Sequence, residues 1–194
     1  MSREEQIDMS SVNGLDIAYL SPAEAGDLGL AASVAALINE VYEVAEEGLW
    51  VEGTTRTSTQ EVESFVRSAE IVTARLDGAI VGCVRIQRLD ERTCEFGMLA
   101  AAPKRRGMGI GRELVRFAEQ DGRQKGFEVM QLELLVPREW SQPSKVFLNE
   151  WYTRIGYRVS ATGAIEDYYP ELAPLLATTC DFVIYHKNLR GQPA

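Results

Sequence analysis

The chain contains little of what disulfide frameworks and histidine-based metal sites require. Its 194 residues include three cysteines, Cys83, Cys94 and Cys180, and a single histidine, His186. The odd number and unpaired spacing of the cysteines indicate reduced thiols, so we expect a cytoplasmic protein. One histidine cannot build a zinc site of several histidines, and we interpret His186 as an ordinary residue of a C-terminal strand. We therefore expect no metal.

Long apolar runs are also missing. The N-terminus is polar and acidic with no apolar stretch behind it, which argues against a secretory signal. The longest mostly apolar run, residues 28–38, is about half as long as a membrane span, so we expect no membrane partner. The composition is 45% hydrophobic and 25% charged, as in ordinary globular proteins. The length suits one α/β domain over 1–194, with a loose terminus at 1–13.

Positive charge is scarce overall but concentrated in one segment. The formal net charge is −9. Residues 1–70 carry 3 basic and 14 acidic side chains, a local charge of −11, whereas residues 104–125 carry 7 basic and 3 acidic ones, a local charge of +4. This segment can receive a polyanionic ligand, although an ordinary solvated helix face explains it equally well. The acidic total argues against general nucleic-acid binding.

Apolar periodicity and turn residues predict a mixed α/β architecture. We expect helices at 29–47, 58–69, 109–125 and 143–155, and strands at 15–20, 71–76, 79–88, 92–101, 127–136, 157–160 and 180–187. The turn Asp77-Gly78 joins two strands of an antiparallel meander. A helix connects strand 92–101 to strand 127–136, so these two should be parallel with a right-handed crossover. The sheet should have six to seven strands, with helices on both faces.

The most informative stretch lies between strand 92–101 and the following helix. It reads PKRRGMGIGR, and its alternating glycines, Gly107, Gly109 and Gly111, let successive backbone N–H groups face one point. The following helix adds free N-terminal donors and the positive end of its dipole. Such a place binds pyrophosphate well.

Other glycine-rich phosphate loops do not fit this stretch. The dinucleotide pattern G-x-G-x-x-G fails because Leu114 or Arg112 occupies the place of its third glycine. A P-loop is excluded because Gly-Lys-Ser/Thr occurs nowhere in the chain. The pattern that fits is R-x-x-G-x-G, with Arg106 as its first residue.

At these residues the sequence resembles the GCN5-related N-acetyltransferase (GNAT) superfamily. The match extends to the strand end LAAAP at 99–103 and to Tyr152, four residues before the pair Gly156-Tyr157. The resemblance covers about 70–160. It implies the GNAT fold, whose central mixed sheet is splayed between its fourth and fifth strands. Two departures, Lys145 where many relatives have Asn and Leu148 where a small residue is common, put contacts to the pantetheine arm in doubt.

The resemblance also implies acetyl-CoA as cosubstrate, held by the core at 71–160. The backbone of Leu99 and Ala101 should hold the pantetheine arm, and a backbone N–H there can stabilise the oxyanion of the tetrahedral intermediate. The expected pyrophosphate contacts are Arg106, Gly107, Met108, Gly109, Ile110, Gly111 and Arg112. Surface solvation is the alternative role for the arginine side chains.

Three residues are candidates for proton transfer. Tyr152 is the expected general acid, because a phenol with a pKa near 10 can protonate a leaving thiolate whose thiol has a pKa of about 8.5. Glu95 is the expected base for the acceptor amine, and Glu133 is its rival. The alternative role for Tyr152 is that of a core tyrosine, and the alternative for Glu95 and Glu133 is that of ordinary strand carboxylates. A route through an acyl-Cys94 is disfavoured against direct attack on the thioester.

The acceptor should bind to the N-terminal helices over 14–70, with Tyr42, Glu46, Trp50 and Arg56 as candidate contacts. The acidic bias there suits a cationic amine, and equally suits solubility. The implied function is acetyl transfer to a primary amine of a small molecule or peptide. The alternatives are a catalytically silent acetyl-CoA sensor and an enzyme using a longer acyl-CoA. The region 161–194 should supply a C-terminal strand, and a homodimer is a further expectation from the resemblance.

Overall fold

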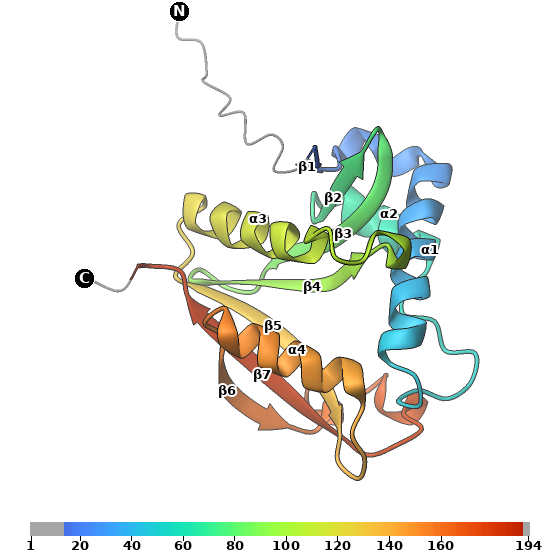
Figure 1. Cartoon of the computed structure of the whole chain (residues 1–194), viewed down its shortest axis with the longest axis vertical. Helices are drawn as coiled ribbons and strands as arrows, with labels where there is room; N and C mark the ends of the chain where they lie inside the picture. Colours follow the sequence, from blue (N-terminus) through green and yellow to red (C-terminus); the bar gives the residue numbers. More distant parts are fainter. Residues whose placement is uncertain (1–13, 192–194) are drawn as a thin grey trace, which may run out of the picture.

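The computed structural model describes residues 14–191, so the loose terminus expected at 1–13 lies outside the described residues. One seven-stranded mixed sheet has the strand order β1-β2-β3-β4-β5-β7-β6 (Figure 1). Its strands are β1 (Asp16–Tyr19), β2 (Ile71–Leu76), β3 (Ala79–Arg88), β4 (Thr93–Ala101), β5 (Val129–Pro137), β6 (Arg158–Gly163) and β7 (Cys180–Asn188). The helices are α1 (Leu28–Ala45), α2 (Thr59–Arg67), α3 (Ile110–Gln124) and α4 (Pro143–Arg154). Short 3-10 helices are η1 (Pro22–Gly26), η2 (Pro103–Arg105), η3 (Ile165–Asp167) and η4 (Ala173–Leu175).

The predicted meander and the predicted parallel pairing of the two strands joined by a helix are both confirmed. Strands β2, β3 and β4 pair antiparallel, and the turn between β2 and β3 has left-handed backbone at Asp77 (φ 51°) and Gly78 (φ 79°), as a two-residue hairpin turn requires. β4 pairs parallel with β5 through α3. β7 then inserts antiparallel between β5 and β6, which leaves β6 at the edge of the sheet.

The expected splay between the fourth and fifth strands is present. β4 and β5 pair only from Thr93 to Glu95, opposite Val129 to Gln131, and then diverge (Figure 1). β4 pairs with β3 on both sides of an irregularity at Met98 (φ 49°), where the register of β3 shifts. The sheet therefore opens into a V whose closed end lies at Glu95.

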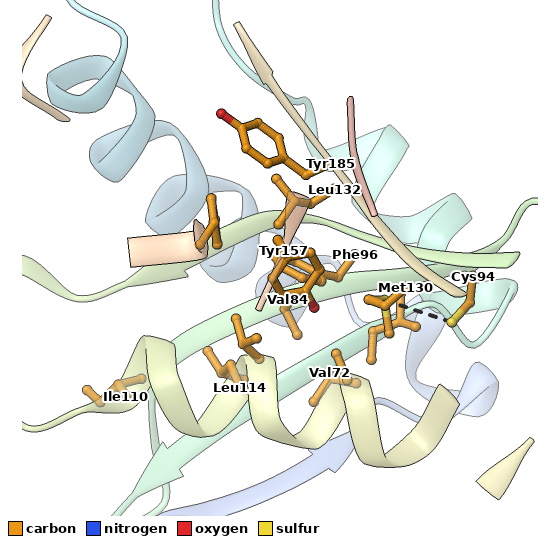
Figure 2. Packing of buried hydrophobic residues seen from close by; sticks show 14 of the residues in the cluster. Val72, Val84, Cys94, Phe96, Ile110, Leu114, Met130, Leu132, Tyr157 and Tyr185 are labelled. Carbon is orange, nitrogen blue, oxygen red and sulfur yellow. Dashed lines mark hydrogen bonds between the residues drawn. The ribbon is translucent and has the colours of Figure 1, made fainter. Parts of the chain in front are cut away.

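One face of the sheet carries α3 and α4. Figure 2 shows Leu114 of α3 near Val84 of β3, and both belong to the same core as Ile110 and Phe96. The close approach of α3 to β3 depends on Gly82, because a Cβ there would lie 2.6 Å from Ile110 Cγ2. The N-terminus of α3 is thereby held against the splayed part of the sheet.

The opposite face carries α1 and α2. α2 begins with a capping box, in which Ser58 Oγ accepts from Glu61 N at 3.2 Å and Ser58 N donates to Glu61 Oε2 at 3.0 Å. α1 continues well past the apolar run at 28–38. By length and composition alone, its 18 residues are long and apolar enough to cross a membrane. In this fold its buried stripe, which includes Val34 and Ile38, packs on the sheet.

The segment between α1 and α2 joins the two halves of the splayed sheet. Val51 N donates to Leu175 O at 2.8 Å, and Ala177 N donates to Leu49 O at 2.9 Å. The buried side chain of Leu49 also packs with Phe182 of β7. Because α1 belongs to the β1–β4 half and these partners belong to the β5–β7 half, the segment spans the splay on the α1 face.

Candidate active site

The glycine-rich loop ends in an N-terminal helix cap with no side chain. Gly109 is the N-cap of α3 and has left-handed backbone (φ 75°), and Gly107 does too (φ 87°). The first-turn N–H groups, from Ile110 to Arg112, have no acceptor within the helix, and a glycine cap offers none. These donors, together with the helix dipole, form a place for an anion.

The cations around this loop divide into paired and unpaired ones. Arg112 Nε lies 3.2 Å from Glu113 Oε1, so this predicted phosphate contact is already engaged. Within residues 14–191, Lys104, Arg105 and Arg106 have no ion pair. The exposed side chain of Arg106 is therefore the better placed of the two predicted arginines to meet an added negative charge.

The edge of β4 that faces the opening has unpaired backbone groups. Ala102 N donates to Val81 O at 2.9 Å, on the β3 side. Backbone directions alternate along a strand, so the groups of Ala101 and Leu99 point to the other side, away from β3. β5 has already diverged there, and this edge can accept an extended ligand as an additional strand would be accepted.

Tyr152 lies on α4 in an aromatic cluster under the opening. Its ring is 6.0 Å from Phe96 and 6.0 Å from Tyr157, and the side chain is 5% exposed. Within the described part of the chain its hydroxyl has no hydrogen-bond partner. Burial, reinforced by the nearby Tyr42, raises the pKa of Tyr152 well above the ordinary phenol value on which the sequence argument relied. The hydroxyl therefore keeps its proton at every working pH.

Glu95 and Glu133 meet at the closed end of the V. Gln131 Nε2 donates to Glu95 Oε2 at 3.0 Å and to Glu133 Oε1 at 3.2 Å, so one amide bridges the two carboxyls. Gln87 Nε2 donates to Glu95 Oε1 at 3.0 Å, and the Tyr169 hydroxyl donates to Glu133 Oε2 at 3.0 Å. The two rival bases of the sequence analysis thus form one hydrogen-bonded group.

The environment of this pair makes it a proton acceptor near neutral pH. Burial is the main cause that raises the pKa of Glu95 to about 7, and the negative charge of the adjacent Glu133 is the next. Burial also raises the pKa of Glu133, and the positive charge of Arg56 opposes that rise. A carboxylate that titrates near the working pH is suited to general-base catalysis.

The four predicted acceptor contacts lie around one cavity of about 420 Å³ between the end of α1 and η4. Tyr42 and Arg56 belong to its wall, and the Arg56 guanidinium carbon lies 5.3 Å from the centre of the Tyr42 ring. The positive charge of Arg56 also acts on Glu133, so this wall of the cavity lies within electrostatic reach of the candidate base.

Both carboxylate oxygens of Glu46 already contact other side chains of the protein. Its Oε1 lies 2.7 Å from Lys145 Nζ, and its Oε2 accepts from Trp50 Nε1 at 2.6 Å. The Lys145 and Glu46 side chains are only 4% and 9% exposed. Lys145, one of the two departures from the family pattern, thus links α4 to the end of α1 across the opening.

Breaking this buried ion pair is expected to destabilise the fold. Glu46→Gln would leave Lys145 buried without a counter-charge, which costs about 3–5 kcal/mol. Urea unfolding should show a lower midpoint with an unchanged slope. Glu47→Gln, at an exposed position next in the chain, is the matched control and should behave as wild type. Equal midpoints for the two variants would show that the pair adds nothing to stability.

The cysteine route finds no support in this geometry. Cys94 packs in the core on the α3 face, whereas its neighbour Glu95 points to the α1 face. Burial raises the pKa of the Cys94 thiol to about 11, so it carries no thiolate at neutral pH. Across residues 14–191 there is also no group of three His, Cys, Asp or Glu side chains able to hold a metal ion.

Sequence reasoning missed three residues of this site, Gln87, Gln131 and Tyr169, and set a fourth aside. Gln131 and Tyr169 hold the carboxyl pair, and His186, interpreted as an ordinary strand residue, contacts Gln131 Oε1 at 2.9 Å through Nε2. Alternation along β5 places Gln131 and Glu133 on one face, and was the available signal for Gln131. Tyr169 follows η3, in a segment without regular periodicity, where no such signal exists.

The fold thus places an unpaired strand edge beside a helix N-terminus whose first N–H groups are free of side-chain caps. The chain belongs to the acetyltransferase (GNAT) family, whose model matches residues 35–144. Compared by sequence with curated proteins, it has no significant match.

Several solved structures share the fold. YncA from Salmonella typhimurium, solved with its cofactor acetyl-CoA, is 16% identical with a TM-score of 0.64, over 94% of this chain and 98% of that one. A GNAT family acetyltransferase from Elizabethkingia anophelis with acetyl-CoA bound is 16% identical with a TM-score of 0.59, over 91% and 99%. N-acetylglutamate synthase from Neisseria gonorrhoeae, complexed with coenzyme A and N-acetyl-glutamate, is 19% identical with a TM-score of 0.60, over 91% of this chain but 35% of that one. This chain therefore spans about a third of that synthase.

Proposed function

We propose that this protein is an N-acetyltransferase that moves the acetyl group of acetyl-CoA to a primary amine of a small molecule or peptide. The observation that carries the proposal is the opening between β4 and β5, with an anion-receiving helix N-terminus on one face and the Glu95–Glu133 pair on the other. In this proposal 71–160 holds acetyl-CoA, 14–70 receives the acceptor, and the whole forms one catalytic domain.

The proposed binding mode uses mainly backbone groups. The N–H groups from Gly107 to Arg112, with the side chain of Arg106, would hold the pyrophosphate. The outward-facing backbone of Leu99 and Ala101 would hold the pantetheine arm. Two structures of the same fold that contain acetyl-CoA support acetyl-CoA as the ligand. Because backbone donors do not depend on the missing asparagine at Lys145, the departure there does not prevent it.

The proposed chemistry is direct attack of the amine on the thioester. Acetyl-CoA supplies the acetyl group: a C–N bond forms, the C–S bond breaks, and the thiolate leaves. The amine needs to lose a proton, since alkylammonium groups titrate near 10.4, and the Glu95–Glu133 pair would accept it. A backbone N–H on the open β4 edge would stabilise the oxyanion, and Tyr152 would hydrogen-bond to the departing sulfur and protonate it.

Tyr152→Phe is expected to slow the chemical step by on the order of 10²-fold, the low end for a lost general acid, because the raised pKa of Tyr152 reduces the driving force for donation. Pre-steady-state acetyl transfer measures this rate. The Kd for coenzyme A should change little, since the hydroxyl is not placed in the phosphate loop. Unchanged melting would show that folding is intact, and equal chemical rates for both forms would remove Tyr152 from the mechanism.

The proposed function is tested by thiol release from acetyl-CoA with a panel of amines, supported by a mass-spectrometric screen of a metabolite extract with labelled acetyl-CoA. Amine-dependent release of coenzyme A supports the proposal. Tight binding of acetyl-CoA without turnover on any amine would favour the silent sensor instead. Thermal shifts with acetyl-, propionyl- and succinyl-CoA compare the acyl groups.

A further inference from the structure

A row of polar side chains crosses the sheet at the closed end of the V. Gln87 of β3, Glu95 of β4, Gln131 of β5 and His186 of β7 stand directly opposite one another in the strand registers. Each is hydrogen-bonded to the next, at 3.0 Å, 3.0 Å and 2.9 Å in that order. Four strands therefore contribute one side chain each to a continuous polar row.

The hydrogen-bond directions in this row leave little freedom. Gln131 Nε2 faces two carboxyl groups, Glu95 and Glu133, which accept when ionised. The opposite amide orientation would turn its oxygen toward both carboxylates. Gln131 Oε1 is thus left to accept from His186, so His186 Nε2 carries a hydrogen, and both assignments follow from the network.

The groups around the carboxyl pair come from several elements. Arg56, between α1 and α2, acts on Glu133 through its positive charge, and Tyr169, after η3, donates to the same residue. Burial of the ring lowers the pKa of His186, and the negative charge of Asp90, beyond the row, opposes that change. The bridge at Gln131 is the contact shared by both carboxyls, and its N–H favours the ionised form of each.

We propose that Gln131, clamped by His186, is a positioning residue that holds Glu95 and Glu133 together as one base facing the opening between β4 and β5. Glu95 and Glu133 also interact directly with each other, and a proton on one carboxyl can be shared with the other. Without the bridge the two carboxyls would lose their common donor, and once both are ionised their charges would repel each other with no amide hydrogen between them. His186 acts through Gln131, because its ring fixes which end of the amide meets the carboxyls. Only the effect on the reaction rate rests on the proposed acetyl transfer; the effect on the carboxyl pair does not depend on it.

The kinetic test replaces Gln131 by Met, which has similar length and no N–H. Losing one hydrogen bond to a charged group should move the acid limb of the kcat/KM profile to higher pH by about one to two units. His186→Phe, which removes the clamp from the other end, should move the limb in the same direction by less, and it serves as the second variant if the first fails to fold. Gln60→Met, at an exposed position on α2, is the control and should leave the profile unchanged.

The second readout does not require activity. Since the chain has one histidine, the imidazole nitrogen signals of untagged, ¹⁵N-labelled protein belong to His186 alone. We expect the Nε2–H tautomer in the wild type, faster exchange of that hydrogen with water in Gln131→Met because its acceptor is gone, and carboxyl ¹³C signals of Glu95 and Glu133 that titrate at higher pH in that variant. An Nδ1–H tautomer in the wild type, or unchanged carboxyl titrations, would overturn the inference. If these signals behave as expected in a protein that transfers no acetyl group, the positioning role stands and the proposed function fails.

Discussion

Gly109→Glu is expected to abolish binding of coenzyme A and acetyl-CoA, with Kd raised by more than about 100-fold. The new carboxylate would stand at the N-cap of α3, where the proposed pyrophosphate meets the helix donors. Placing like charges together costs several kcal/mol, and each 1.4 kcal/mol is a tenfold change in Kd. Isothermal calorimetry with coenzyme A measures the effect.

The control separates charge from backbone strain. Because Gly109 has φ 75°, any larger side chain there is strained, and Gly109→Gln has the same strain and size as the glutamate without its charge. We expect Gly109→Gln to weaken binding less than Gly109→Glu, while the two variants melt at similar temperatures. Wild-type affinity in Gly109→Glu would place the pyrophosphate elsewhere and remove the basis of the proposed function.

Glu95→Gln is expected to lower kcat by about 10²- to 10⁴-fold, the usual contribution of a general base. Glu95 is the natural choice within the pair because it is 6% exposed and lies where β4 and β5 part. Glu133→Gln is the matched comparison, with a smaller expected loss. A larger loss in Glu133→Gln would assign the base to Glu133.

The pH dependence of the wild type should report the same group. A base acts when deprotonated, so kcat/KM should rise with pH through a midpoint near 7, the pKa to which burial and Glu133 raise Glu95. The acceptor amine titrates near 10.4, which keeps the two limbs apart. In Glu95→Gln the limb near 7 should disappear while the amine limb remains.

Stability should change with pH in the opposite direction to activity. The pKa of Glu95 is about 7 in the folded protein against an ordinary value of 4.5, so between these values the folded state holds a proton that the unfolded chain has released. The free energy of unfolding should therefore fall as pH rises from 4.5 to 7, and this fall should be shallower in Glu95→Gln. Urea unfolding at several pH values measures it without any substrate.

Local sequence was sufficient for the backbone of the glycine-rich loop and for most of the fold. Alternating glycines between a strand and a helix specify left-handed backbone at Gly107 and Gly109 and a helix start with no side-chain cap, because these are requirements of a few adjacent residues. Apolar periodicity likewise predicted the strands of the meander to within a residue or two. The family resemblance, carried by the same loop and by Tyr152, added the splay between β4 and β5.

What the sequence alone determined is therefore the backbone: where strands end, where glycine permits N–H groups to converge, and which helix begins beside them. The tertiary structure alone decided the state of the side chains. It joined Glu46 to Lys145, 99 residues later, and Glu95 to Gln131, 36 residues later. Ionisation and pairing depend on which groups share a buried space, and chain segments far apart in sequence fill that space together.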